Sequence, residues 1–248
     1  MPGIRRIGVQ DLMQALSLGV QDFMAAPTQL LFLGMIYPLV GVLAAATAAQ
    51  ADLFPLLYPA LAGISIMGPL AALGMYELSR QRELGADVTW RNALDVRHSR
   101  SLWSIAWLGA VLLAVFIAWL AVAESIHAAT MATLPHAGMA DFIANLLSTR
   151  EGWTMIIAGN GAGLLFAMLV LTLTVVSFPM MLDRDVGMLD AIVTSFRAVW
   201  HNPFPMAIWG LMVAGLLLLG SLPLFVGLAF IMPILGHATW HLYRRMVV

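Results

Sequence analysis

The stretch LWSIAWLGAVLLAVFIAWLAVA, residues 102–123, has no charged residue and decides the fold class. A helix needs about 20 apolar residues to cross the roughly 30 Å hydrocarbon core of a bilayer, so this stretch is long enough for one crossing. Four other long windows are free of Asp, Glu and Arg, and they lie between Asp22 and Asp52, Asp52 and Glu77, Glu151 and Asp183, and Arg197 and Arg244. The sequence therefore predicts an all-α protein that crosses a membrane several times.

The last window is too long for one crossing. A turn signal, formed by Gly220, Ser221, Leu222 and Pro223, lies near its middle. We therefore divide this window in two and predict six transmembrane helices, arranged as three helical hairpins.

An internal repeat organises the predicted hairpins. Each is preceded by an amphipathic segment, at residues 8–24, 87–99 and 187–200, of the kind that lies in the membrane–water interface. The repeat units cover residues 8–80, 87–183 and 187–245, and the second contains an external loop at residues 125–151. We expect a pseudo-threefold repeat within a single integral membrane domain, residues 1–248.

Composition supports the membrane class and excludes several others. The chain is 61% apolar and 10% charged, whereas average soluble domains are about 45–50% apolar and about 25% charged. A net charge of −1 argues against a nucleic-acid partner, and the lack of cysteine excludes a disulfide scaffold. The segments outside the predicted spans are too short for a soluble domain, and we expect no enzyme.

Arginine placement predicts the orientation. With six spans, eleven arginines lie on the side of the two termini and only Arg150 lies on the other side. The positive-inside rule then places both termini in the cytoplasm, and we expect a bacterial inner membrane protein whose first partner is the lipid bilayer.

Four ionisable residues follow the proline near the end of a returning helix, at related positions in the three repeats. Glu77, Asp183, His237 and His241 would lie at one depth if the repeats pack around a common axis. The i, i+4 spacing of the two histidines is typical of metal sites on a helix, and the set is a candidate metal or proton site. The alternative is that all four lie at the headgroup level, bonded to water and to neighbouring arginines.

The external loop offers soft metal ligands. His127, Met131, His136 and Met139 combine imidazoles with thioethers, which suit copper(I), although their spacing matches no specific motif. Methionine is abundant throughout the chain and commonly only fills gaps in apolar packing.

The fourth predicted span contains a small-residue segment. Gly159 and Gly163 allow close helix approach, and Asn160 can hydrogen-bond across such a contact. We favour helix packing over a polar solute path here.

Several motifs resemble those of an uncharacterised family of bacterial multi-pass membrane proteins. They are the ending at residues 233–245, the segment 177–185, Gly68-Pro69 with residues 76–80, and the start at Asp11-Leu12. The resemblance implies a fold without an activity. Some relatives are loosely labelled cytochrome c oxidase subunit I, but only His237 and His241 lie on a predicted span, too few for the haems and copper of that subunit.

Three functions therefore remain open. The sequence favours a non-catalytic accessory or assembly component of a larger membrane complex, in which a respiratory or energy-transducing partner is suggested by the family label. The alternatives are a small-solute or ion transporter or channel, and a metal- or haem-handling protein that uses His237 and His241. The sequence requires no cofactor.

Overall fold

The computed structural model describes residues 2–28, 30–32, 34–36, 39–40, 59–63, 65–132, 134 and 138–248. These residues form helices and no strand beyond an isolated bridge between Ile4 and Val247. In chain order the helices are α1 (Val9–Ala25), η2 (Ser65–Met67), α4 (Gly68–Ala71), α5 (Leu73–Glu83), η3 (Trp90–His98), α6 (Leu102–Thr130), α7 (Met139–Ser148), α8 (Arg150–Thr174), α9 (Ser177–Asp183), α10 (Met188–His201), α11 (Pro203–Ser221) and α12 (Leu228–Met246).

Four helical stretches are long and apolar enough to cross a membrane: Pro59–Glu83, Leu102–Thr130, Arg150–Asp183 and Pro203–Ser221. They support the membrane class that the uncharged windows predict. Of the six expected spans, the first lies largely outside the described residues. The last corresponds to α12, which is not among the four; its second half contains two histidines and two arginines.

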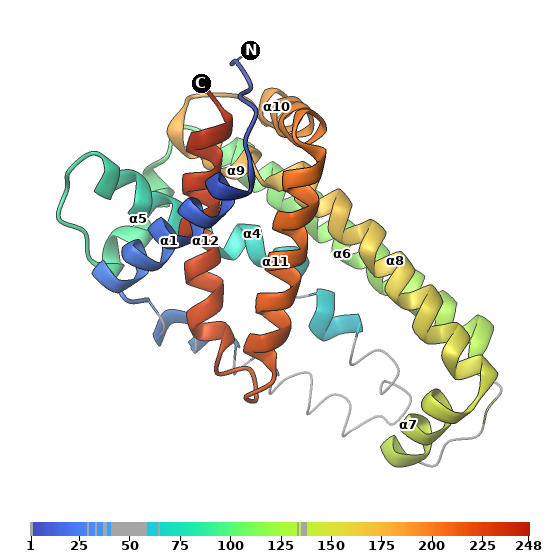
Figure 1. Cartoon of the computed structure of the whole chain (residues 1–248). Helices are drawn as coiled ribbons and strands as arrows, with labels where there is room; N and C mark the ends of the chain where they lie inside the picture. The colour runs from blue at the N-terminus through green and yellow to red at the C-terminus, as the bar shows by residue number, and fades with distance from the viewer. Residues whose placement is uncertain are drawn as a thin grey trace. The chain divides into compact units, whose positions relative to one another are not determined.

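Contacts divide the chain into two compact units: residues 1–36, 68–110 and 170–248 form the first, and residues 37–67 and 111–169 form the second. In the first unit α12 is central, because α1, α5, α9 and α11 all pack against it. The termini lie side by side beyond the end of α12 (Figure 1), where the Arg5 amide donates to the Met246 carbonyl.

The α1–α12 contact depends on small residues. A Cβ atom at Gly19 would lie 2.7 Å from the Ala238 backbone nitrogen, so only glycine allows the observed approach. Leu12 and Ala15 are fully buried on the same face of α1. The apolar residues of this amphipathic helix are therefore only partly buried. Leu12 and Phe23 are buried, whereas Val9, Met13 and Val20 are exposed.

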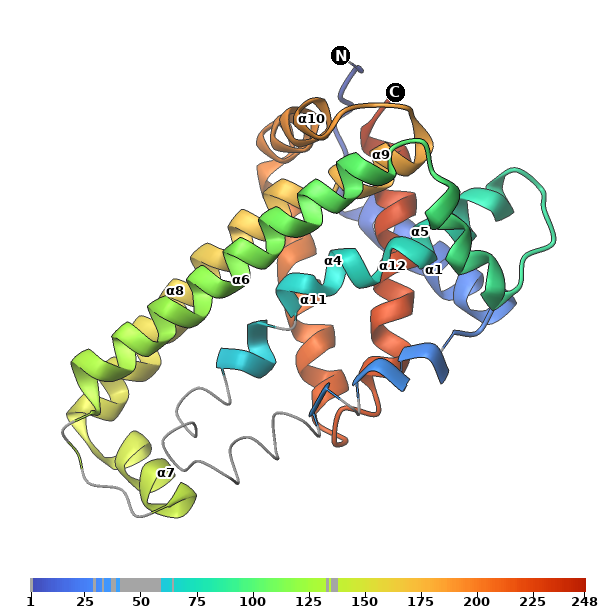
Figure 2. The ribbon, with the colours of Figure 1, turned by 180° about the vertical axis from the view of Figure 1, so that it is seen from behind.

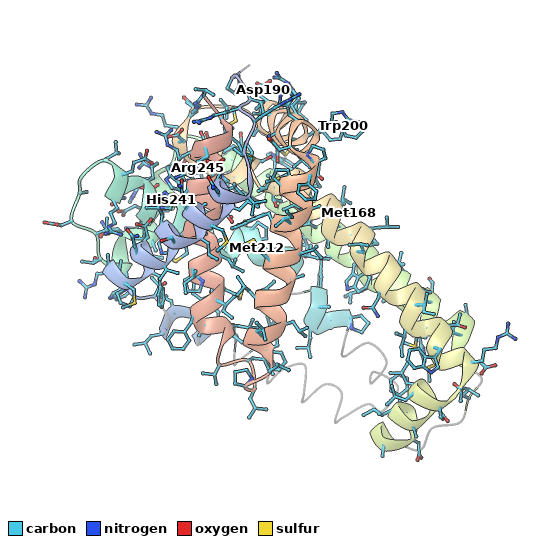
Figure 3. The ribbon with its side chains drawn as sticks, viewed as in Figure 1. Met168, Asp190, Trp200, Met212, His241 and Arg245 are labelled. Carbon is cyan, nitrogen blue, oxygen red and sulfur yellow. The ribbon has the colours of Figure 1, made fainter. Side chains whose placement is uncertain are left out.

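Helix α10 also has two distinct faces. Its small residues Ala191, Ser195 and Ala198 are fully buried, and the Ser195 hydroxyl donates to the Thr172 carbonyl near the end of α8. Its exposed side bears large apolar residues: Leu189, Val193, Phe196 and Trp200. Figure 3 shows Trp200 projecting away from the helices around it.

The turn predicted at residues 220–223 lies between α11 and α12. Helix α11 ends at Ser221 and α12 begins at Leu228. The backbones of Gly220 and Gly227 approach so closely that a Cβ on Gly227 would lie 2.8 Å from Gly220. The two helices are neighbours in both views (Figures 1 and 2). The segment at residues 87–99, expected as the second amphipathic helix, forms the 3₁₀ helix η3, which packs on α5.

The second unit is built on residues 111–130 of α6 and 150–169 of α8, which lie side by side (Figures 1 and 2). Trp119 of α6 contacts Phe166 of α8 edge to face at 5.5 Å, and its indole nitrogen donates to the Pro59 carbonyl. The short helix α7 connects α6 and α8. Gly152, in the first turn of α8, lets this helix begin close against the end of α7, because a Cβ there would clash with the Leu146 carbonyl oxygen.

Candidate functional site

A buried polar cluster lies where α1, α5 and α12 meet, and we call Asp22, Ser79, Arg82, His237 and His241 the Asp22 cluster. The Ser79 hydroxyl lies 2.5 Å and the His241 Nε2 atom 2.7 Å from Asp22 Oδ2. Arg82 Nη1 donates to Asp22 Oδ1 at 2.5 Å. One carboxylate therefore accepts hydrogen bonds from two different helices.

Helix geometry brings these residues together. Asp22 follows Leu12, Ala15 and Gly19 along the buried face of α1. His237 and His241 are one turn apart on α12, and Figure 3 shows His241 and Arg245 where α1 crosses that helix. Close packing of α12 on α5 requires Gly236, because a Cβ there would lie 2.8 Å from the Met75 Cβ.

Hydrogen-bond directions determine which nitrogen of His237 has the proton. The Ser79 hydroxyl has a single hydrogen, which it donates to the ionised Asp22 carboxylate. His237 Nδ1, 2.8 Å from the Ser79 oxygen, must then be the donor in that contact. The neutral ring is therefore left with a lone pair on Nε2.

That lone pair is buried. His237 is 1% exposed, and its Nε2 atom has no hydrogen-bond partner among the described residues. His237 Nδ1 also lies 3.9 Å from Asp22 Oδ2, so the ring is close to the ionised carboxylate.

The surroundings favour the ionised form of Asp22. Burial raises the pKa of this carboxyl, but the hydrogen bonds from His241 and Ser79 and the nearby imidazoles outweigh burial and hold the pKa below its ordinary value. Arg82 is 39% exposed, so the cluster reaches solvent on its arginine side. Removal of Asp22 would leave several donors without an acceptor.

The four residues of the predicted metal or proton site do not share one set of partners. The two histidines belong to the Asp22 cluster. Glu77 accepts two hydrogen bonds from Arg80, at 2.7 and 2.9 Å. Asp183 accepts from the Tyr243 hydroxyl at 2.6 Å. Within the described part of the chain, no group of three or more His, Asp or Glu residues is placed to hold a metal ion.

Glu77 and Asp183 do line a common pocket of about 460 Å³ in the first unit. Its other charged or ionisable lining residues are Arg80, Asp95, His98, Arg100, Arg184 and Asp185. Arg184 lies 3.5 Å from Asp183, so at least two carboxylates already have an arginine partner. Glu77 and Asp183 thus bond to neighbouring arginines, whereas His237 and His241 bond to Ser79 and Asp22.

The proposed copper ligands are only partly described. His127 and Met131 are both buried, 9% and 2% exposed, near the end of α6. Neither ring nitrogen of His127 has a hydrogen-bond partner among the described residues, and each unsatisfied buried polar atom costs about 1–3 kcal/mol. His136 and the side chain of Met139 lie outside the described residues.

The small-residue segment of α8 contributes to packing at one of its three predicted positions. A Cβ at Gly163 would lie 3.4 Å from the Trp119 ring, in ordinary contact. A Cβ at Gly159 or Gly161 would meet no described atom within 4 Å. Asn160 is exposed, and its amide nitrogen donates to the Ile156 carbonyl of the same helix.

Asp22, Ser79 and Arg82 are the cluster residues that sequence reasoning missed. The sequence places Asp22 among the polar residues of the first amphipathic segment, but the structure buries it. Its spacing of three from Gly19 and of seven from Ala15 was the available signal, since those positions share a helical face.

The described residues are mostly helical, and four of the helical stretches are long and apolar enough to cross a membrane, which are the features of an all-α integral membrane protein. The chain belongs to a family described as predicted integral membrane protein (DUF2189), whose model matches residues 56–183. Membership confirms the resemblance to an uncharacterised membrane family. Comparisons with curated proteins and with solved structures found no match.

Proposed function

We propose that this chain is a non-catalytic accessory or assembly component of a larger membrane complex. In this proposal the outer face of α8 packs against a transmembrane helix of another protein. The observation that favours it is Asn160. This amide is ten residues into the 25-residue helix α8 and is exposed in a stretch that is apolar enough to cross a membrane.

An amide side chain in hydrocarbon is stabilised when a neighbouring helix offers a hydrogen-bond partner. Gly161, next to Asn160, leaves open space that a partner backbone can approach closely. Ile157, Leu164 and Met168 are exposed on the same helix and would surround the contact. A polar centre with an apolar rim is an arrangement suited to a specific helix pair.

Cross-linking tests this proposal directly. The chain has no cysteine, so Gly161→Cys introduces a single thiol that accepts a photoreactive benzophenone maleimide. In native membranes we expect one discrete product heavier than the 26.8 kDa chain. The matched control is Leu211→Cys, which is equally lipid-accessible on α11 and should give lipid adducts only.

Two results would contradict the accessory role. A product at twice the chain mass would identify a second copy as the occupant of this face. Adducts only to lipid, or to the chain itself, at both positions would mean that no other protein packs on α8.

For the architecture we propose six spans in three hairpins, with both termini in the cytoplasm of a bacterial inner membrane. Four of the six crossings would be the four candidate spans, one of which is α11. The other two would be α12 and the window between Asp22 and Asp52. The exposed apolar side of α10 supports an interfacial position for that helix. Single cysteines at Ser148 and Ser99 test the orientation, since a membrane-impermeant maleimide should label only the first from outside.

A second candidate function is proton-coupled transport, which the Asp22 cluster favours. The chain of contacts from the partly exposed His241 through Asp22 and Ser79 ends at the buried Nε2 of His237. Buried ionisable groups of this kind occur along proton pathways. Proteoliposomes with an internal pH-sensitive dye test this function: an imposed pH gradient should collapse faster with the wild type than with Asp22→Asn.

Metal or haem binding by His237 and His241 is the third candidate. One nitrogen of each ring already bonds to Ser79 or Asp22, which leaves the second nitrogens as the available ligands. Elemental analysis and an optical spectrum of the wild type, beside the His237→Ala/His241→Ala variant, test it. A stoichiometric metal or a haem band that the variant lacks would favour this function over the other two.

A further inference from the structure

The second unit contains a buried histidine whose environment differs from that of every residue in the Asp22 cluster. His127 is nine-tenths buried, and neither Nδ1 nor Nε2 has a hydrogen-bond partner among the described residues. A neutral imidazole has one donor and one acceptor, so both functions are removed from water without compensation. An unsatisfied group of this kind indicates a water or an ion that completes it.

The residue one turn further on identifies the class of ligand. The Met131 amide donates to the His127 carbonyl at 2.9 Å, so the helical geometry continues through this pair and both side chains lie on one face. Met131 is 2% exposed. Side chains at this spacing have Cβ atoms about 5–6 Å apart, close enough for an imidazole nitrogen and a thioether sulfur to bind one ion.

The surroundings of this pair are apolar. The Phe142 ring of α7 lies 6.4 Å from the His127 ring and is itself buried. An imidazole, a thioether and an apolar enclosure suit a soft monovalent cation, whereas hard divalent cations require oxygen ligands.

We propose that His127 and Met131 form a binding site for one Cu(I) ion at the end of α6, beneath α7. The site is independent of the accessory function proposed above, because it uses neither Asn160 nor the outer face of α8. The thioether and imidazole would supply two ligands to the ion, and Phe142 would shield it from solvent.

The test is a Cu(I) competition titration of the detergent-purified full chain under reducing, oxygen-free conditions, with bathocuproine disulfonate as the competing chelator. The affinity tag must contain no histidine. Because the chain has no cysteine, thiolates cannot contribute to the measured binding. We expect one Cu(I) per chain, and X-ray absorption should show both nitrogen and sulfur ligands.

His127→Leu and Met131→Leu test the two ligands separately. Each should weaken Cu(I) binding by more than the roughly 10–100-fold that loss of an outer-shell partner costs. Met131→Leu nearly conserves volume, so it should keep the fold even if His127→Leu does not. The matched controls His98→Ala and Met24→Leu remove an exposed imidazole and an exposed thioether and should leave binding unchanged.

Three results would overturn the proposal. The first is that the wild type retains no Cu(I) in competition with the chelator, which would mean that water alone satisfies His127. Alternatively, the affinity would be the same in both leucine variants as in the wild type. In the third case, the controls would lose as much affinity as the site variants, which would show dispersed binding by surface residues.

Discussion

The two units of the chain treat their polar groups differently. In the first unit, Asp22 accepts hydrogen bonds from Ser79, Arg82 and His241, and nearly every polar atom of the cluster is paired within the chain. In the second unit, the His127 imidazole is buried with no hydrogen-bond partner among the described residues, and Asn160 is exposed on an apolar helix. Apart from His237 Nε2, the Asp22 cluster is thus satisfied within the first unit, whereas the second unit has groups that something outside the chain can satisfy.

A buried ionisable residue is therefore not in itself a sign of a ligand site. The Asp22 cluster has the greater number of ionisable groups, but its members stabilise the contact of α1 with α5 and α12. His127 has no such role among the described contacts.

The largest expected effect is the loss of Asp22. Asp22→Ala leaves Ser79, His241 and Arg82 without their common acceptor, and we expect a loss of about 3 kcal/mol in the free energy of unfolding. Thermal unfolding in detergent, followed by tryptophan fluorescence, measures it. The control is Asp11→Ala, which removes a more exposed ion pair with Arg245 and a hydrogen bond from the Gly8 amide, and it should cost only about 1 kcal/mol.

The two buried histidines should respond in opposite ways to the same substitution. His237→Leu removes a hydrogen bond to Ser79 from a closely packed site, and we expect it to cost about 2 kcal/mol. His127→Leu removes an unsatisfied polar ring in the metal-free protein, so its free energy of unfolding should stay the same or rise. Equal losses in the two variants would remove the distinction between the two units.

The glycines provide a second matched pair. Gly19→Leu forces a side chain against the Ala238 backbone, and overpacking of this kind costs about 1–3 kcal/mol or more. A Cβ at Gly159 meets no described atom within 4 Å, so Gly159→Leu should leave the free energy of unfolding of the isolated chain unchanged. The same fluorescence-detected melting curves measure both, and a large loss for Gly159→Leu would mean that this face is buried within the chain.

The smallest of these effects on stability is the dependence on pH. Because the pKa of Asp22 is lowered in the folded chain, its contribution to stability is fully present above the ordinary value of 3.8. The contribution is lost as the pH falls below 3.8 toward the folded pKa. Melting temperatures should therefore fall on acidification through this range, and the fall should be smaller in Asp22→Asn.

Uncharged windows predict the membrane helices because the hydrocarbon thickness sets a minimum number of consecutive apolar residues, which can be counted in the sequence. The turn at Gly220 and Pro223 is visible for the same reason, since local chain geometry determines it. The Arg80–Glu77 pair is also local, at a spacing of three residues. These elements can be predicted because residues close together in the sequence determine their structure.

The Asp22 cluster depends instead on which helices approach one another. Asp22 and His241 are 219 residues apart, and they meet because Gly19 lets α1 lie directly on α12. Likewise, Asp183 is bonded by Tyr243, 60 residues away, which no helical periodicity indicates. The sequence correctly places the two histidines on one helical face, but it cannot show that an aspartate from α1 lies opposite that face.

The most direct test of the central claim, that α8 packs against another membrane protein, is the native mass after extraction in a mild detergent. The wild type should form a complex heavier than one 26.8 kDa chain, with a different protein present in fixed stoichiometry. Asn160→Leu should run as the single chain with an unchanged melting temperature, while Leu211→Ala should keep the complex. A monomeric wild type, or a complex that survives Asn160→Leu intact, would contradict the claim.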